Sequence, residues 1–188
     1  MYIVGLDLGQ AQDYTALAII EVSDDDEPTM HLRHLHRYPL GTAYPQIVAG
    51  VDALMAREEL GADAELVVDA TGVGAAVVDM LYAAGLYFTP VIITGGDVVH
   101  REGSAYRVPK RDLVAAVQTL LQTQRLRFAA GMPLVDVLTT ELVNFRYKIT
   151  DAGNDTYGGR EGTHDDLVLA VALACWKANS TGPLLRFA

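Results

Sequence analysis

The chain has 188 residues, of which 51% are hydrophobic and 20% are charged, and its formal net charge at pH 7 is −10. This length and composition predict one globular domain over 1–188 and exclude a disordered chain, and the negative charge argues against broad, sequence-independent binding to nucleic acid. The sequence has no signal peptide, no apolar run of the roughly 18 residues that span a bilayer, and a single cysteine, Cys175, so we expect a cytoplasmic protein with no membrane partner.

Three short strands are expected first, over 2–9, 15–22 and 30–38, and their short links predict an antiparallel meander. Apolar residues then recur at helical spacing from Ala43 to Leu60. The elements expected after these are a strand over 65–70, a helix over 73–85, a strand over 86–93, helices over 109–124 and 133–145, a hairpin over 145–159 and a helix over 165–179. The expected fold class is α/β, with a central mixed sheet of meander and parallel strands flanked by helices.

Four aspartates stand within or at the ends of apolar segments, where a lone carboxylate is costly to desolvate. Asp7 lies in the first strand, Asp69 ends the strand over 65–70, and Asp165 and Asp166 open the last helix. If the fold brings these carboxylates together, their mutual repulsion adds to the cost, and a divalent cation reverses it. The sequence therefore predicts a site for Mg²⁺ or Mn²⁺, ions that also bind phosphate oxygens.

Each of these aspartates also has a structural interpretation. Asp165 and Asp166 could cap the last helix, with Thr163 as the N-cap residue. Asp69 could be a turn residue at a strand end, and Asp7 could form a structural salt bridge. Three such coincidences together are less probable than any one of them.

Four longer segments are similar to a known family. The segments GLDLGQAQDYTALAII, VVDATGVGAAVVDML, VPKRDLVAAVQTLLQTQRLRF and REGTHDDLVLAVALACW resemble the nuclease domain of the large terminase subunit of tailed bacteriophages, within the ribonuclease H-like, retroviral-integrase superfamily. The resemblance extends from Tyr2 to about Lys177, and HDDLVLAVALA is its most specific part.

The resemblance implies an endonuclease that cuts double-stranded viral DNA during genome packaging, with two Mg²⁺ or Mn²⁺ ions and two-metal hydrolysis. It implies that Asp7 and Asp69 are metal ligands, that Asp165 and Asp166 are the paired acids of the last helix, and that Asp13 is an additional acid near the metals.

We prefer Asp166 to Asp165 as the direct ligand. Asp166 shares a helix face with Ala170 and Ala174, whose small side chains let that face approach the sheet. Asp165 then serves the second ion or the attacking water. His164 is expected to assist proton transfer or to contact the scissile phosphate, and the alternative is a histidine bonded to backbone at a helix start.

DNA contacts are expected from basic side chains, because they neutralise phosphates. The candidates are Arg101, Arg107, Lys110, Arg111, Arg146, Lys148 and Arg160. For each of them the alternative is a solvated surface charge. Since no base-reading motif is evident, we expect little sequence specificity, and the acidic chain should bind DNA weakly, with binding lost by about 150–200 mM salt.

The family also implies partners, namely a terminase ATPase domain, the small terminase subunit and the portal. No G-x-x-x-x-G-K-[ST] motif occurs in this sequence, so we expect no ATPase domain within it.

Other functions are alternatives to the nuclease. One is a phosphotransferase of the actin and sugar-kinase type, suggested by GLDLG, and another is a dinucleotide-binding module, suggested by Gly72 and Gly74 but opposed by Val77. A Holliday-junction resolvase on the same fold and a catalytically silent DNA-packaging domain are the others.

Overall fold

A computed structural model describes residues 1–9, 13–72, 74–149, 155–158 and 164–181, and within them eight strands form one mixed sheet. The strands are β1 (Tyr2–Asp7), β2 (Ala16–Val22), β3 (Met30–Arg37), β4 (Glu65–Asp69), β5 (Phe88–Thr94), β6 (His100–Glu102), β7 (Ala105–Pro109) and β8 (Leu126–Phe128). Their order across the sheet is β6-β7-β5-β4-β1-β2-β3-β8. β1, β2 and β3 form the expected antiparallel meander, and β4, β5 and β7 run parallel to β1.

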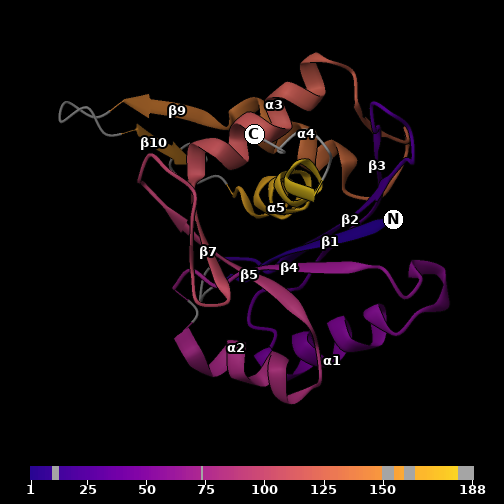
Figure 1. Cartoon of the computed structure of the whole chain (residues 1–188), viewed down its shortest axis with the longest axis vertical. Coiled ribbons are helices and arrows are strands. Elements are labelled where there is room, and N and C mark those ends of the chain that lie inside the picture. The colour runs from indigo at the N-terminus through magenta and orange to yellow at the C-terminus, as the bar shows by residue number, and fades with distance from the viewer. Residues whose placement is uncertain (10–12, 73, 150–154, 159–163, 182–188) are drawn as a thin grey trace.

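Helices cover both faces of this sheet. They are α1 (Tyr44–Met55), the single 3₁₀ turn η1 (Glu58–Leu60), α2 (Gly74–Ala83), α3 (Lys110–Gln122), α4 (Val135–Asn144) and α5 (Asp166–Thr181). Figure 1 shows α3, α4 and α5 on one face and α1 and α2 on the other. A separate antiparallel pair, β9 (Arg146–Ile149) and β10 (Asp155–Gly158), lies beside the first helical layer. The expected α/β class with a mixed sheet is confirmed.

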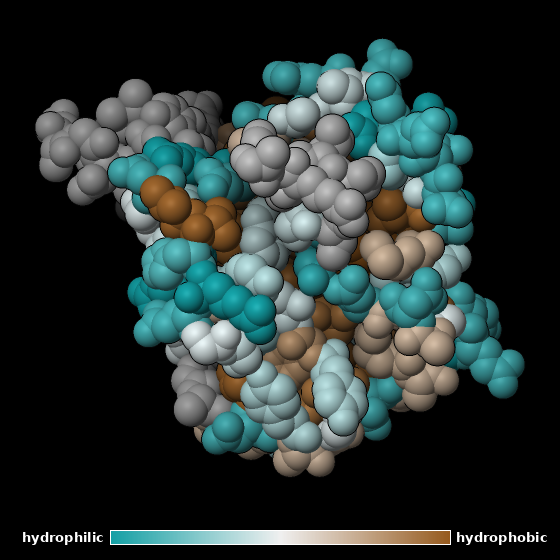
Figure 2. All heavy atoms as spheres, viewed as in Figure 1, coloured by the Kyte–Doolittle hydropathy of each residue, from teal (hydrophilic) through white to brown (hydrophobic). Residues whose placement is uncertain are grey.

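The apolar side chains gather into two clusters, one between the sheet and each helical layer. Figure 2 shows hydrophilic side chains over much of the visible surface, with hydrophobic ones in small patches between them. Within the described part of the chain, no helix combines the length and the apolar character needed to cross a membrane.

β1 serves both clusters because successive side chains of a strand point to opposite faces of the sheet. Val4 and Leu6 pack on the side of α1 and α2, and Ile3 packs on the side of α5. Gly5 also faces α5, since a Cβ added to it would lie 2.0 Å from the carbonyl oxygen of Ala170. The α5 backbone therefore lies directly on β1, and Asp7, two residues beyond Gly5, projects from the same face.

Two expectations about the elements are wrong. The helix expected from Ala43 to Leu60 is divided, because Arg57, between α1 and η1, has an extended backbone with φ −71° and ψ 132°. The strands β6, β7 and β8 were not expected, since β6 and β8 have only three residues each and β7 lacks the continuous apolar run by which the equally short β4 was recognised. The predicted hairpin over 145–159 is present as β9 and β10, and its turn lies outside the described residues.

The contact between Gly5 and α5 leads to a first prediction. Gly5→Ala should lower the free energy of unfolding by about 2 kcal/mol, because the new methyl group meets helix backbone that cannot rotate away. Gly95→Ala is the matched control, since a Cβ there meets nothing within 4 Å, and it should change stability by no more than about 0.5 kcal/mol. Urea denaturation measures both, and equal effects of the two substitutions would contradict the direct packing of α5 on β1.

Candidate active site

Two of the predicted aspartates lie side by side at one edge of the sheet. Asp7 ends β1 and Asp69 ends β4, and these strands are adjacent and parallel, with Gly5 paired to Val67 two residues before each aspartate. Asp7 is 8% exposed and Asp69 is 7% exposed. The two carboxyl groups are close enough to interact electrostatically. The edge where parallel strands end is also where ligands bind in open α/β sheets.

The other two aspartates reach this edge from α5. Asp166 is the first residue of the helix and is only 4% exposed, whereas 27% of the side chain of Asp165 is exposed. Because Ala170 and Ala174 lie against Gly5, the start of α5 is carried to the end of β1 where Asp7 lies. The expected close approach of this helix face to the sheet is confirmed.

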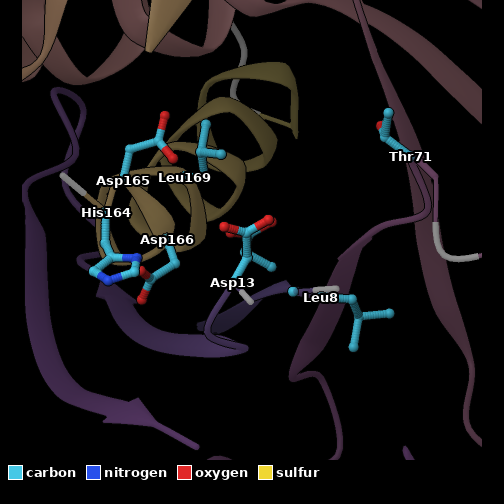
Figure 3. Close-up of a pocket in the computed structure, with 9 residues that line it drawn as sticks. Leu8, Asp13, Thr71, His164, Asp165, Asp166 and Leu169 are labelled. Carbon is cyan, nitrogen blue, oxygen red and sulfur yellow. The ribbon is translucent and has the colours of Figure 1, made fainter. Parts of the chain in front are cut away.

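A cavity of about 220 Å³ opens over the carboxylates of Asp7, Asp165 and Asp166, and Asp69 does not line it. Its lining residues are Asp7, Leu8, Gly9, Asp13, Thr71, His164, Asp165, Asp166 and Leu169. Figure 3 shows His164, Asp165 and Asp166 on one side of this cavity, Thr71 on the opposite side and Asp13 between them. The fold therefore gathers residues from β1, the segment after it, the end of β4 and the start of α5.

Burial opposes the ionisation of Asp7, Asp69 and Asp166, and for Asp7 the charges of neighbouring acids add to this effect. Burial, followed by the charges of Asp69, Asp165 and Asp166, raises the pKa of Asp7 well above its ordinary value. Burial also raises the pKa of Asp69, which hydrogen bonds from Thr71 oppose. The four carboxylates thus form one electrostatic unit, which is the convergence that their positions in the sequence predict.

Two basic residues offset part of this negative charge. The Nζ of Lys110 lies 3.2 Å from Oδ2 of Asp165, and the Nε of Arg37 donates a hydrogen bond of 2.7 Å to Oδ2 of Asp166. Burial raises the pKa of Asp166, and the charge of Arg37 acts in the opposite direction. Among the described residues, no three acidic, histidine or cysteine side chains are arranged as they stand to hold one ion. Ion binding would therefore require side chains of this cluster to move closer to one another.

The donors at this site nevertheless fit Mg²⁺ or Mn²⁺. They are carboxylate oxygens, the ligands that hard divalent cations prefer. Oδ1 of Asp166 is buried and accepts no hydrogen bond from any residue in the described part of the chain. A buried oxygen without a donor is costly, and a cation is one partner that would satisfy it. Mg²⁺ also retains several waters, so one or two protein carboxylates for each ion suffice.

Asp69 has the turn role that its position suggested, in addition to its place beside Asp7. Its Oδ1 accepts a hydrogen bond of 2.7 Å from the backbone N–H of Thr71. The hydroxyl oxygen of Thr71 in turn accepts a bond of 2.7 Å from the backbone N–H of Ile93 in β5. The turn after β4 is thereby tied to the next strand, which fixes the orientation of the Asp69 carboxylate.

Glu141 is a residue of this region that the sequence analysis missed. Its Oε2 accepts hydrogen bonds from the backbone N–H groups of Leu167 and Val168, at 3.1 Å and 3.4 Å, so a side chain of α4 caps the start of α5. Thr163, the cap suggested by the sequence, lies outside the described residues. The available signal was that Glu141 follows Leu138 by three residues, on the buried stripe of α4.

Arg37 is the second missed residue. It ends β3, where the alternation of polar and apolar residues made it resemble an ordinary exposed position. Its guanidinium group bonds both Asp166 and Glu141, and 15% of its side chain is exposed. No local pattern in the sequence connects Arg37 with its partners, since Glu141 and Asp166 follow it by 104 and 129 positions.

The predicted DNA-contacting residues are in different environments. Lys110 lies among the aspartates, and the others that the structure describes are on or next to the β6–β7 hairpin. Arg107 pairs with Glu102 at 3.0 Å, Arg111 pairs with Asp97 at 2.7 Å, and the guanidinium of Arg101 lies 5.6 Å from the ring centre of Tyr106. The side chains of Arg146 and Lys148, on β9, and the whole of Arg160 lie outside the described residues.

A comparison with protein families assigns the chain. The model described as the terminase RNase H-like domain matches residues 4–177. The chain belongs to this family. The match covers the strands and helices that build the aspartate site, which favours this family over the phosphotransferase and dinucleotide-binding alternatives.

Individual relatives agree with this family. The chain is 28% identical over 174 residues to the large terminase subunit of Thermus virus P23-45 and 29% identical to that of Thermus phage G20c. Each alignment covers 93% of this chain and 31% of the relative, so the chain spans about a third of their length. The crystal structure of the large terminase nuclease of phage G20c with bound magnesium gives a TM-score of 0.70 at 28% identity, over 93% of this chain and 80% of that one.

The raised pKa values lead to a prediction about stability in EDTA. Burial, followed by the charge of Asp166, raises the pKa of Glu141 from 4.5 to about 7, and the pKa values of Asp7, Asp69 and Asp166 are raised as well. Between its unfolded and folded pKa, each group holds a proton in the folded protein that the unfolded chain has released. The free energy of unfolding should therefore fall as the pH rises from about 5 to about 8.

Urea denaturation at several pH values measures this slope. Mg²⁺ should restore stability more at pH 8 than at pH 5.5, because the acids are then ionised. Asp7→Asn should stabilise the protein at pH 8 in EDTA and remove the effect of Mg²⁺, and Asp25→Asn, at an exposed position, is the control. Stability that rises with pH in EDTA would contradict the assignment of these carboxyls as buried and mutually repelling.

Proposed function

We propose that this chain is the metal-dependent endonuclease domain of a terminase large subunit, which hydrolyses phosphodiester bonds of double-stranded viral DNA during genome packaging with little sequence specificity. The observation that carries the proposal is the convergence of Asp7, Asp165 and Asp166 on one cavity, with Asp69 beside Asp7 on the adjacent strand. The family match and the magnesium bound in a related nuclease support it.

In this proposal Asp7, Asp69 and Asp166 hold the ions, Asp165 serves the second ion or the attacking water, and Asp13 is an additional acid at the cavity. When bound, two Mg²⁺ or Mn²⁺ ions would activate a water molecule for in-line attack and stabilise the leaving 3′ oxygen. The chain's own contribution is to hold these carboxylates at one sheet edge before DNA arrives, so that little rearrangement opposes the reaction.

His164 and Lys110 complete the proposed site. The imidazole of His164 is exposed in the cavity and meets the ring of Tyr14 edge-on, with ring centres 4.7 Å apart. This position allows it to transfer a proton or to contact the scissile phosphate. Lys110 lies close enough to Asp165 to bind a phosphate oxygen next to the acids once DNA is present.

The partners follow from the family rather than from contacts of this chain. Because the chain spans about a third of its curated relatives, we propose that it acts beside a terminase ATPase domain, with the small terminase subunit and the portal, in the cytoplasm of the host cell. The β6–β7 hairpin, with Arg101 and Arg107, and the neighbouring Arg111 are the proposed contacts with the DNA backbone.

The central experiment replaces one aspartate at the sheet edge. Asp7→Asn should reduce nicking and linearisation of plasmid DNA in Mn²⁺ by at least about a hundredfold, because the substitution removes a charge that the ions need. Asp25→Asn should cleave like the wild type, since Asp25 is an exposed loop residue. Undiminished cleavage by folded Asp7→Asn would overturn the proposed function, and an anomalous map from a Mn²⁺-soaked crystal would show the ligands directly.

The salt dependence of DNA binding tests the arginines. Among the described residues Arg101 has no acidic partner, whereas Arg111 is held by Asp97 at 2.7 Å, so Arg101 is the more available to a phosphate. Arg101→Gln should reduce the slope of log K against log salt by about one unit, and Arg111→Gln should change it less. Fluorescence anisotropy with a short duplex in Ca²⁺ measures both, and an unchanged slope for Arg101→Gln would remove Arg101 from the DNA surface.

A further inference from the structure

We propose that Arg37, held in place by Glu141, sets how Asp166 is offered to a divalent ion, by engaging one carboxylate oxygen and leaving the other free. Arg37 and Glu141 are then positioning residues that act through Asp166. The inference rests on the proposed function, in which Asp166 is a metal ligand, and it assigns roles to two residues outside the aspartate cluster.

The contacts of Arg37 define a fork between two acids. Its Nε donates to Oδ2 of Asp166 at 2.7 Å, and its Nη2 donates to Oε1 of Glu141. The side chains of both acids are less exposed than that of Arg37, at 5% and 7% against 15%. A planar guanidinium presents its N–H groups in fixed directions, so its position determines where both carboxylates lie.

Glu141 fixes the other end of this network. One of its oxygens bonds Arg37, and the other accepts the backbone N–H groups of Leu167 and Val168 in the first turn of α5. Both oxygens are therefore engaged, and the Glu141 side chain connects α4, β3 and α5. The orientation of Arg37 is thereby coupled to the start of the helix that carries Asp166.

The consequence for Asp166 is an asymmetry between its two oxygens. Oδ2 is engaged by Arg37, and Oδ1 is buried without a hydrogen-bond donor among the described residues. A carboxylate held in this way can offer an ion one oxygen without releasing the arginine. Arg37 also places a positive charge next to the metal site, which should weaken the binding of a divalent ion. At the same time it should orient the Asp166 carboxylate correctly for the ion that does bind.

Arg37 is also connected to His164 through an aromatic residue. Its guanidinium carbon lies 4.8 Å from the ring centre of Tyr14, and that ring contacts His164. Arg37 is thus linked to both Asp166 and His164. A simple structural brace is a weaker explanation, because a buried ion pair seldom adds net stability over apolar residues of similar volume.

The proposal predicts opposite shifts in metal affinity for two substitutions. Arg37→Gln removes the competing positive charge, and Mn²⁺ should bind about three- to tenfold more tightly. Glu141→Gln keeps an oxygen that can accept the N–H groups of the α5 backbone, but it removes the negative charge that partly neutralises Arg37. The positive charge of Arg37 then acts on Asp166 alone, and Mn²⁺ should bind more weakly by a similar factor. In both variants kcat for plasmid cleavage at saturating Mn²⁺ should fall about 10- to 100-fold.

Isothermal titration calorimetry of the 188-residue chain with Mn²⁺, without DNA, measures the affinities, and thermal melting in EDTA confirms folding. Arg37→Lys keeps the positive charge but loses the planar group that bonds both acids in fixed directions. Its affinity for Mn²⁺ should therefore stay near the wild-type value while kcat falls. Lys177→Gln is the matched control, because it removes an α5 ion pair, with Glu65, away from the site and should change neither quantity.

Shifts in the same direction for Arg37→Gln and Glu141→Gln, or no shift in either, would overturn the positioning role and identify the network as a structural brace. Should Arg37→Gln fail to fold, Glu141→Gln and Arg37→Lys still separate charge from geometry. The wild type and Asp7→Asn belong in the same titration. If the wild type and Asp7→Asn bind Mn²⁺ with equal affinity, the proposed function itself fails. If Asp7→Asn binds Mn²⁺ more weakly but the Arg37 and Glu141 variants bind it like the wild type, only the positioning role of Arg37 and Glu141 fails.

Discussion

Repulsion among buried carboxylates is the constraint on which the rest of this structure depends. Asp7, Asp69 and Asp166 are each less than 10% exposed, and burial opposes the ionisation of all three. For Asp7, burial is joined by the charges of Asp69, Asp165 and Asp166. A fold selected only for stability would not place like charges at one sheet edge. Their proximity is understandable if divalent cations bind there, because the ions convert the repulsion into attraction.

The packing that makes this arrangement possible depends on an absent side chain. Gly5 allows the α5 backbone to lie on β1, with Ala170 and Ala174 on the contacting face of the helix. A larger residue at position 5 would hold the helix away from the sheet, and Asp166 would move away from Asp7 with it. The geometry of the acids is therefore set by backbone contact one turn further along the helix, in the interior of the protein.

Arg37, Lys110 and Glu141 show how the chain tolerates its own acidic site. Arg37 and Lys110 each pair with one of the two aspartates at the start of α5, and Glu141 accepts hydrogen bonds from two backbone N–H groups in the first turn of this helix. Glu141 therefore takes a capping role that the sequence suggested for Asp165 and Asp166.

The α/β class, the meander, most of the helices and the candidate aspartates could be predicted from the sequence, because each depends on local periodicity or on a charge placed in an apolar segment. The strands β6, β7 and β8, which lack a long periodic or apolar run, and the break at Arg57 could not. The contacts of Arg37 with Asp166 and Glu141 became evident only in the folded chain, since these residues come from β3, α5 and α4. Contacts between distant segments depend on how helices pack on a sheet, and a single sequence carries no local pattern that specifies them.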